Sequence, residues 1–338
     1  MKYKKQMEKI LSICIPSYNM EGFLGRCVDS LLVSEVLDKL EIIIVNDGSN
    51  DKTLSIANNY KQEYSNSILI IDKPNGHYGS CVNAALQVVT GKYFRIVDAD
   101  DWVDSNSLKT VIDTLSHTDV DVLFTKCMNH ICGKNQQIPR KYSDITFNTI
   151  LDLNKFRVPD CILSMHSLTY RTQLLRDINY KQTEGICYTD TEYVCFPMCQ
   201  ARTLYALDIF LYQYYIGRDD QSMAFNSIER NLNHTYPLIK RFSMEKTNHN
   251  GNKNSKYIHE HFIKIAATQL YIYSIIFCRR NAEREKKNRE LLNDLKENNK
   301  EVFDIIINIK AKKLIPYVKI WYYHPRISRI LRCGKFFI

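Results

Sequence analysis

The first hundred residues alternate short apolar runs with stretches whose apolar residues recur at helical spacing. This alternation is typical of chains in which strands and helices follow one another to build a parallel sheet. Strands are predicted at residues 11–15, 41–45, 68–71 and 93–97, with helices between them at about 23–32, 54–60 and 80–89. Pro16 is expected to end the first strand. We therefore predict an α/β fold with a mostly parallel central sheet.

The pattern changes in the second half of the chain. A strand at 120–125 continues the alternation, but the residues from about 226 onward have the periodicity of helices, interrupted by a polar loop at 246–256. We predict two parts, a sheet-containing domain at 1–220 and a helical C-terminal region at 221–338.

The positive charge of the chain is concentrated at its C-terminal end. The net charge is +9, and residues 310–338 contain eight basic residues and no acidic one. Ile327, Ile330 and Leu331 fall together on a helix there, so we expect this basic tail to contact an anionic membrane surface. Packing of a C-terminal helix on the fold is the main alternative. We expect no nucleic-acid partner, because no motif of that class accompanies the tail.

The cysteines and the apolar segments bear on location. The eleven cysteines show no metal-ligand spacing, which favours free thiols in a reducing cytosol. The most apolar long stretch, 258–277, contains charged residues. Its uncharged part is therefore too short to span a membrane. We expect a cytoplasmic protein, located at the inner face of the cell membrane if the tail binds lipid.

Three carboxylates follow the strand at 93–97 within four residues. They belong to Asp98, Asp100 and Asp101, and like charges this close repel unless a cation or several donors lie between them. Ligands usually bind at the carboxyl ends of strands in α/β proteins, and aspartates there suit a hard divalent cation. In isolation, the same residues favour a helix N-cap over a cation site.

Three ordered motifs resemble those of family 2 glycosyltransferases. They are SICIPSYN at 12–19, IVNDGSND at 44–51 and VDADD at 97–101, and the resemblance extends over roughly residues 10–220. It implies a GT-A fold, a nucleotide-sugar donor and inversion at the anomeric carbon.

The resemblance also implies roles for the acidic motif. Asp98-Ala99-Asp100 matches the DxD motif of the family. Asp100 is then expected to hold Mg²⁺ or Mn²⁺ on the donor diphosphate, and Asp98 to bind the nucleotide or the metal. Such a cation neutralises the charge that develops on the departing diphosphate.

The nucleoside is expected at the ends of the first two strands. Asp47 can accept the imide N–H of a uracil ring, which favours a UDP-sugar, and Pro16, Tyr18 and Glu21 match positions that line this pocket in the family. Asp47 is also a good turn residue, and Glu21 suits the first turn of a helix.

Two loops are expected near the diphosphate. Residues 73–83 resemble the Gly-rich loop of the family, where Lys73, Asn75 and His77 offer donors, but Val82 stands where many members have an arginine. Arg218 looks like the arginine of an Arg-x-x-x-Ser element found in related bacterial enzymes, although a surface turn explains it equally well.

Asp190 aligns with the catalytic base of the family. A carboxylate is needed there because a sugar hydroxyl is a very weak acid. Thr189 replaces the glutamate that usually precedes the base, and Glu192 is a rival two residues away. The segment from Thr189 to Glu192 also reads as a helix capping box. His166 is expected at the edge of the core, with an acceptor contact as the alternative.

Together these features predict an inverting glycosyltransferase. We expect it to move a hexosyl or N-acetylhexosaminyl group from a UDP-sugar to a hydroxyl of a glycan or lipid-linked acceptor, in the synthesis of a cell-surface polysaccharide. The alternatives are a nucleotidyltransferase, which should carry a Gly-rich basic signature that residues 15–19 lack, and a non-catalytic nucleotide-sugar-binding protein.

Overall fold

The chain forms two compact units in a computed structural model. The structure describes residues 9–218, 221–222, 224–244, 252–277, 281–310 and 316–325. The first unit contains the chain up to Arg218 together with residues 252–254, and the second contains the remaining C-terminal residues. Each unit is described by itself below.

The first unit is built on one ten-stranded sheet. Its strand order is β3-β2-β1-β4-β9-β6-β10-β5, with β7 paired to β6 and β8 to β10. The strands are β1 (Leu11–Ser17), β2 (Leu40–Asp47), β3 (Ile68–Lys73), β4 (Tyr93–Ile96), β5 (Trp102–Val103), β6 (Val122–Ile131), β7 (Gln137–Pro139), β8 (Thr149–Asp152), β9 (Leu168–Arg171) and β10 (Thr203–Ile216). Strands β3, β2, β1 and β4 pair in parallel, as do β6 and β10, so the predicted α/β fold with a mostly parallel sheet is confirmed.

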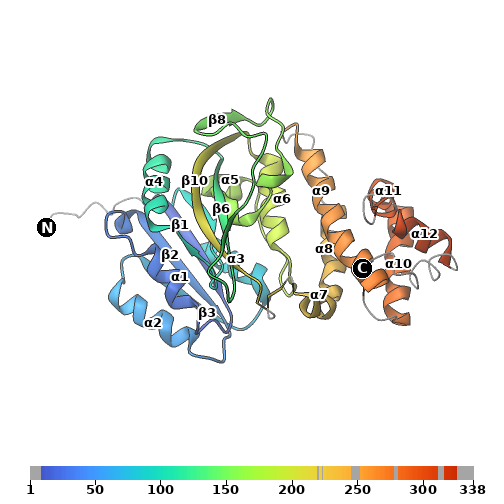
Figure 1. The fold of residues 1–338 in the computed structure, drawn as a ribbon, viewed down its shortest axis with the longest axis horizontal. Coiled ribbons are helices and arrows are strands. Elements are labelled where there is room, and N and C mark those ends of the chain that lie inside the picture. The colour runs from blue at the N-terminus through green and yellow to red at the C-terminus, as the bar shows by residue number, and fades with distance from the viewer. Residues whose placement is uncertain are drawn as a thin grey trace. The chain divides into compact units, whose positions relative to one another are not determined.

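Helices cover both faces of this sheet. They are α1 (Leu24–Leu31), α2 (Thr53–Glu63), α3 (His77–Val88), α4 (Ser105–His117), α5 (Thr172–Asp177) and α6 (Asp190–Gln200), with short 3₁₀ turns at η1 (Leu37–Lys39), η2 (Asp160–Ile162) and η3 (Met165–Ser167). In Figure 1, α1, α2 and α4 lie on one side of the sheet and α5 and α6 on the other.

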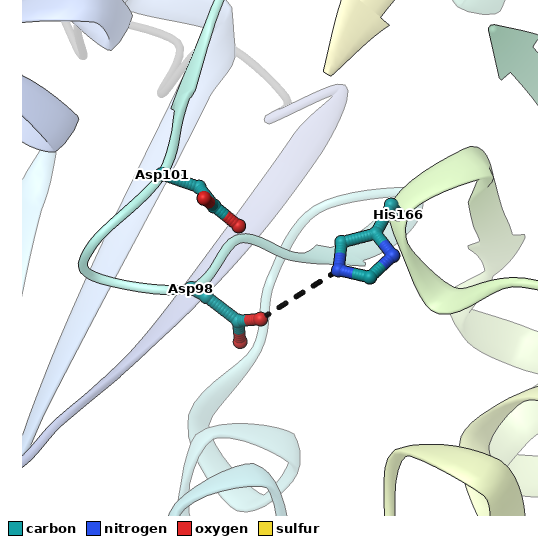
Figure 2. Close-up of side chains that lie close together, drawn as sticks. All are labelled: Asp98, Asp101 and His166. Carbon is teal, nitrogen blue, oxygen red and sulfur yellow. Dashed lines mark ion pairs between the residues drawn. The ribbon is translucent and has the colours of Figure 1, made fainter. Parts of the chain in front are cut away.

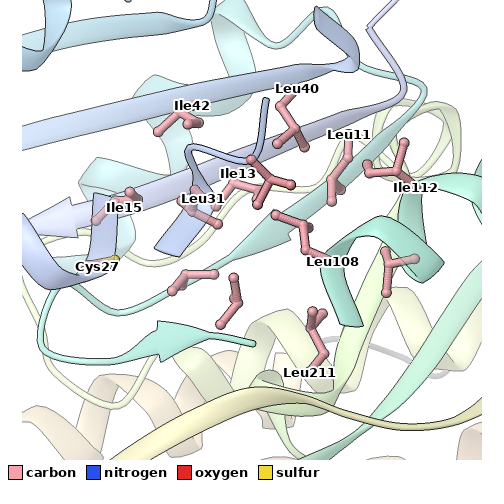
Figure 3. Packing of buried hydrophobic residues seen from close by; sticks show 14 of the residues in the cluster. Leu11, Ile13, Ile15, Cys27, Leu31, Leu40, Ile42, Leu108, Ile112 and Leu211 are labelled. Carbon is pink, nitrogen blue, oxygen red and sulfur yellow. The ribbon is translucent and has the colours of Figure 1, made fainter. Parts of the chain in front are cut away.

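The core of the first unit explains the apolar pattern of its strands. Figure 3 shows side chains of β1 and β2 packed against Leu31 of α1 and Leu108 of α4. On the opposite face, the ring of Tyr193 in α6 meets Phe94 of β4 at 6.3 Å and Tyr170 of β9 at 5.0 Å. Residues of β1, β2 and β4 are therefore buried on both sides, as their continuous apolar runs require.

Strand β1 continues past the proline that was expected to end it. Pro16 pairs in register with Val45 of β2, whereas the pairing of β1 with β4 ends at Cys14. Proline cannot donate to a neighbouring strand. It is tolerated here because β4 has already left that edge of β1.

The second unit consists of helices. They are α7 (Phe225–Asn231), η4 (Leu232–His234), α8 (Thr235–Met244), α9 (Ser255–Ala267), the π-helical segment η5 (Thr268–Phe277), α10 (Ala282–Asn298), α11 (Lys300–Ile307) and α12 (Tyr317–Tyr323). Phe242 of α8 stacks on Phe262 of α9 at 6.2 Å. Among the described residues, no helix is both long enough and apolar enough to cross a membrane.

Part of the predicted basic tail belongs to this unit. Trp321 of α12 is buried, and the guanidinium of Arg289 lies 4.3 Å from its ring and donates to its carbonyl oxygen at 3.0 Å. The described part of the tail therefore packs on α10, as the alternative interpretation anticipated. The tail residues 311–315 and 326–338 lie outside the described residues.

Candidate functional site

The parallel strands bring three of the predicted acidic residues toward one edge of the sheet. Asp47 ends β2, Asp98 follows β4, and the pairing of β1 with both strands aligns their carboxyl ends. Asp190, the first residue of α6, lies close enough to Asp98 for its charge to matter. Burial, followed by the negative charges of Asp100 and Asp190, raises the pKa of Asp98 from its ordinary 3.8 to about 8.

Asp98 has contacts on both of its carboxylate oxygens. The hydroxyl of Tyr78, in the first turn of α3, donates to Oδ1 at 2.9 Å. On the other side, Nε2 of His166 lies 3.9 Å from Oδ2 (Figure 2). The sequence pattern predicted neither contact, although His166 was considered as a residue at the edge of the core.

His166 is held in a defined orientation. Its Nδ1 lies 2.9 Å from the hydroxyl of Ser164, and that hydroxyl accepts from Nη1 of Arg140 at 3.0 Å. Its ring packs against those of Tyr212 and Tyr214, with centroids 4.8 and 4.3 Å away. Burial, reinforced by the charges of Arg140 and Arg95, holds the pKa of His166 well below its usual value, so the imidazole is neutral.

A buried arginine, Arg95, contacts the backbone of this histidine. Arg95 of β4 has no exposed surface, and its guanidinium donates to the carbonyl oxygen of His166 and to the hydroxyl of Thr169 at 2.8 Å. An arginine inside a sheet is costly unless its donors are bonded. Arg95 therefore links β4, which leads into the acidic loop, to the η3 turn that carries His166.

Asp101 anchors the acidic loop. Its Oδ2 accepts from the hydroxyl of Tyr212 at 2.6 Å and its Oδ1 from the backbone N–H of Tyr215 at 2.7 Å. Side-chain ligand atoms of Asp98, Asp101 and His166 all lie within 4.8 Å of one another (Figure 2). Carboxylate oxygens and a neutral imidazole suit a divalent cation, so the residues present fit the metal that the acidic motif suggests.

Asp100 faces an arginine. Its Oδ2 lies 2.9 Å from Nη2 of Arg218, whose guanidinium is stacked 4.4 Å from the ring of Phe23. Arg26 donates to the carbonyl oxygen of Asp100 at 2.6 Å and lies 4.0 Å from the ring of Trp102. The structure thus brings the predicted Asp100 and Arg218 together, and it adds Arg26, which sequence reasoning missed.

A second polar cluster surrounds Asp47. This buried residue accepts on Oδ1 from Nζ of Lys73 at 2.6 Å and from the N–H of Gly76 at 3.0 Å. Nδ2 of Asn75 donates to the carbonyl oxygen of Asp47 at 3.0 Å. The predicted residues of the second strand and of the 73–83 loop therefore share one cluster.

The remaining residues predicted for the nucleoside pocket lie at the end of β1 and beyond it. Pro16 is within β1, and Tyr18 has 46% of its surface exposed. Glu21 lies before α1, outside its first turn, and accepts from the N–H of Lys52, just before α2, at 3.0 Å. Ala99 is buried between its two aspartates.

The predicted base and its rival have different surroundings. Burial raises the pKa of Asp190, and its charge reaches both Tyr78 and Asp98. Glu192 has no exposed surface, and its two oxygens accept from the N–H and the hydroxyl of Thr183, each at 2.7 Å.

Val82 does not line this site. It is fully buried on α3, and the amine of Lys73, one suggested substitute for the usual arginine, is bonded to Asp47 and to Ser80.

Comparisons with known proteins agree with this architecture. Residues 12–177 match the family model described as glycosyl transferase family 2. The uncharacterized glycosyltransferase YibD of Escherichia coli is 28% identical over 251 residues, 71% of each chain. An uncharacterized glycosyltransferase of Mycoplasma pneumoniae is 33% identical over 157 residues, which cover 46% of this chain and about half (51%) of that relative.

Solved structures show the same fold. The structure of Staphylococcus aureus TarS 1–349 in complex with UDP-GlcNAc superposes with a TM-score of 0.65 at 21% identity, covering 96% of this chain and 89% of that one. The mannosyltransferase PcManGT of Pyrobaculum calidifontis, in complex with GDP-Man and Mn²⁺, superposes with a TM-score of 0.53 at 12% identity, covering 96% and 84%.

Proposed function

Because the chain belongs to glycosyl transferase family 2 through its residues 12–177 and has the GT-A fold, we propose that it is an inverting glycosyltransferase that uses a nucleotide-sugar donor. The observation that carries the proposal is that the charges of Asp100 and Asp190 both act on Asp98, which with Asp47 lies at the carboxyl end of the parallel strands. A site of this kind has separate groups for a nucleoside, a diphosphate-bound cation and an acceptor proton.

The donor is proposed to be a UDP-sugar. Oδ1 of Asp47 is occupied by Lys73 and Gly76, and this fixes the carboxylate so that Oδ2 can accept the imide N–H of uracil. Pro16, Tyr18, Glu21 and Asn75 complete the proposed nucleoside side. A hexosyl or N-acetylhexosaminyl group is proposed as the transferred sugar, which is consistent with the UDP-GlcNAc bound in the TarS structure.

The cation is proposed to be Mg²⁺ or Mn²⁺, held by Asp98 and Asp100, with Asp101 and His166 as further ligands because their ligand atoms lie within 4.8 Å of that of Asp98. When bound, it stabilises the charge of the leaving diphosphate as a Lewis acid. Arg218 is proposed to supply positive charge near Asp100 and Lys73 near Asp47, and the Arg218–Asp100 ion pair must open for Asp100 to bind a cation.

Asp190 is proposed as the base. Its carboxylate takes the proton of the acceptor hydroxyl as the oxygen forms a bond to the anomeric carbon, and the bond from that carbon to the diphosphate breaks on the opposite face. Burial favours this role, because a raised pKa makes a carboxylate a stronger proton acceptor.

The acceptor is proposed to be a hydroxyl of a glycan or of a lipid-linked precursor of a cell-surface polysaccharide. Relatives named chondroitin synthase, of Pasteurella multocida, and poly(ribitol-phosphate) beta-glucosyltransferase, of Bacillus spizizenii, support a polymeric acceptor. In this proposal the transferase domain is 1–220, and the basic tail at 310–338 contacts the inner face of the membrane.

Metal-dependent release of UDP from a panel of UDP-sugars, with GDP-mannose as comparison, tests the proposal. We expect Asp190→Asn to reduce release by about 10²- to 10⁴-fold and Asp100→Ala to remove its metal dependence, while the exposed Asp113→Asn remains active. Release of pyrophosphate from a nucleoside triphosphate in the presence of a sugar phosphate, with no UDP released from a UDP-sugar, would indicate a nucleotidyltransferase. Tight UDP-sugar binding without turnover would indicate a binding protein.

A further inference from the structure

Residues 182–185 form a short segment that is hydrogen-bonded both to helix α3 and to the beginning of helix α6. Asn83 of α3 binds its backbone in both directions: Oδ1 accepts from the N–H of Gln182 at 2.8 Å, and Nδ2 donates to the carbonyl oxygen of Gln182 at 2.9 Å. The N–H of Gly185 donates to the carbonyl oxygen of Gly76 at 2.9 Å. The asparagine thus bonds the segment as a neighbouring strand would.

The two elements approach so closely that only glycine fits at their contact. A Cβ atom on Gly79 would lie 2.2 Å from the carbonyl oxygen of Thr183. This distance is well inside van der Waals contact, so the segment is pressed directly onto the first turns of α3.

Helix α6 binds the same segment from its other side. Both oxygens of Glu192 accept from Thr183, and the hydroxyl of Thr189 donates to Oε1 of Gln182 at 3.0 Å. Glu192, Thr189 and Gln182 are all buried. Asp190 lies between Thr189 and Glu192, so the residues on either side of it are fastened to the segment.

Helix α3 is also connected by hydrogen bonds to the residues that are proposed to bind the donor. Its beginning contacts Asp47 through Lys73 and Gly76, and it contacts Asp98 through Tyr78. Asp47, Asp98 and Asp190 are therefore connected through one short stretch of hydrogen-bonded structure.

We propose that Glu192 is a positioning residue that, with Asn83, holds Asp190 at the distance from the donor site that transfer requires. The inference rests on the proposed function, in which Asp190 is the base. Glu192 itself is poorly suited to take a proton from an acceptor, because it has no exposed surface and each of its oxygens already accepts a hydrogen bond. An unpaired Thr183 N–H would let the segment and the start of α6 shift.

Two substitutions at Glu192 test this inference. Glu192→Gln keeps an oxygen for the Thr183 N–H and an amide that can donate to its hydroxyl, so we expect kcat to fall by less than about tenfold. Glu192→Ala removes both contacts, and a shift of about 1 Å at the base is expected to reduce kcat about 100-fold with KM for the UDP-sugar changed less than about threefold.

Asn83→Ala removes the hydrogen bonds between α3 and the segment. As for Glu192→Ala, we expect kcat to fall while KM for the UDP-sugar changes little. UDP affinity, measured by calorimetry, and the thermal midpoint show whether each variant is folded and binds the donor product. Glu63→Gln and Glu63→Ala, at the exposed end of α2, are the matched controls.

The outcomes separate the two proposals. If Glu192→Gln is as inactive as Asp190→Asn while the wild-type chain is active, Glu192 takes the proton and the positioning role is wrong. Equal activity of Glu192→Ala and the wild type would also overturn it. A wild-type chain that releases no UDP from any donor overturns the proposed function and this inference with it.

Discussion

Asp98 is the residue on which most of the site's interactions meet. Tyr78 donates to one of its oxygens, the imidazole of His166 faces the other at 3.9 Å, and the charges of Asp100 and Asp190 act on it. The gap to His166 is longer than a hydrogen bond and lies within the roughly 4.2 Å that can separate two ligands on opposite sides of one divalent ion with bonds of about 2.1 Å. Metal binding and protonation therefore compete at this carboxylate.

We expect Mn²⁺ affinity to rise with pH up to about pH 8. Without metal, Asp98 with a pKa of about 8 is protonated at lower pH, and the ion must displace that proton, so affinity should increase roughly tenfold per pH unit. Titration of free Mn²⁺ by electron paramagnetic resonance at about pH 6, 7 and 8 measures this. Asp98→Asn is expected to bind weakly and with little pH dependence, and a wild-type affinity independent of pH would contradict the prediction.

His166 is expected to contribute to metal affinity. Replacing it by glutamine removes the imidazole that faces Asp98, and Mn²⁺ affinity should fall about tenfold, in the range seen when groups around a metal are altered. His130→Gln is the matched control, because His130 bonds Gln213 and packs on Trp102 away from Asp98. Equal affinities for the two variants would show that His166 only packs beside the site.

The sequence pointed to the acidic residues and to some of their neighbours, such as Lys73 and Arg218, but not to Arg26, Tyr78 or Arg95. Asp47, Asp98, Asp100 and Asp190 stand in motifs at strand or helix ends, where local pattern is informative. The contacts of Asp100 with Arg26 and of Arg95 with His166 join residues 74 and 71 positions apart, and no local pattern indicates such pairs. Their identification required the packed sheet.

At the scale of elements, α3 makes a contact that its sequence did not suggest. The 73–83 loop resembles a diphosphate-binding loop, yet Asn83 and Gly79 face the segment that leads to α6. The apolar strands β1 to β4 were predicted from their sequence, whereas β5, β7 and β8 were not. These missed strands have only two to four residues each, too few for a periodic signal.

Gly79→Ala is expected to disrupt the contact between α3 and the 182–185 segment. The added methyl group would meet the Thr183 carbonyl oxygen at 2.2 Å, so the segment must move, at an expected cost of about 1–3 kcal/mol in the free energy of unfolding. Denaturant unfolding measures the change. Gly22→Ala is the control, since a Cβ there has no neighbour within 4 Å, and equal stability of the two variants would refute the prediction.

At the scale of the molecule, the change from alternating strand and helix signals to a purely helical pattern predicts two parts, at 1–220 and 221–338. That residues 252–254 are part of the first unit could not be predicted from the sequence. Nδ2 of Asn252 donates to carbonyl oxygens at the end of α6. Asn254 is hydrogen-bonded to the backbone of residues 153, 156 and 158. These buried side-chain hydrogen bonds attach two polar loop residues to the first unit.

The stability of the metal-free chain is expected to fall as pH rises. The pKa of Asp98 is raised in the folded state, so between about pH 4 and pH 8 the folded chain holds a proton that the unfolded chain has lost. The free energy of unfolding therefore decreases across this window, and the thermal midpoint of the first unit should be a few degrees lower at pH 8 than at pH 5.5. Calorimetry with and without Mn²⁺ tests this: the metal should raise the midpoint more at pH 8, and Asp98→Asn should reduce the pH dependence.

The double anchoring of Asp101 has a consequence for how a ligand is captured. Because Tyr212 and the Tyr215 backbone already bind both oxygens of Asp101, the loop that carries Asp98 and Asp100 is ordered before any ligand arrives. Little conformational entropy then remains to be lost when this loop engages a donor, so more of the interaction energy is retained as affinity. The time spent waiting for this loop to fold should not limit the rate of donor association.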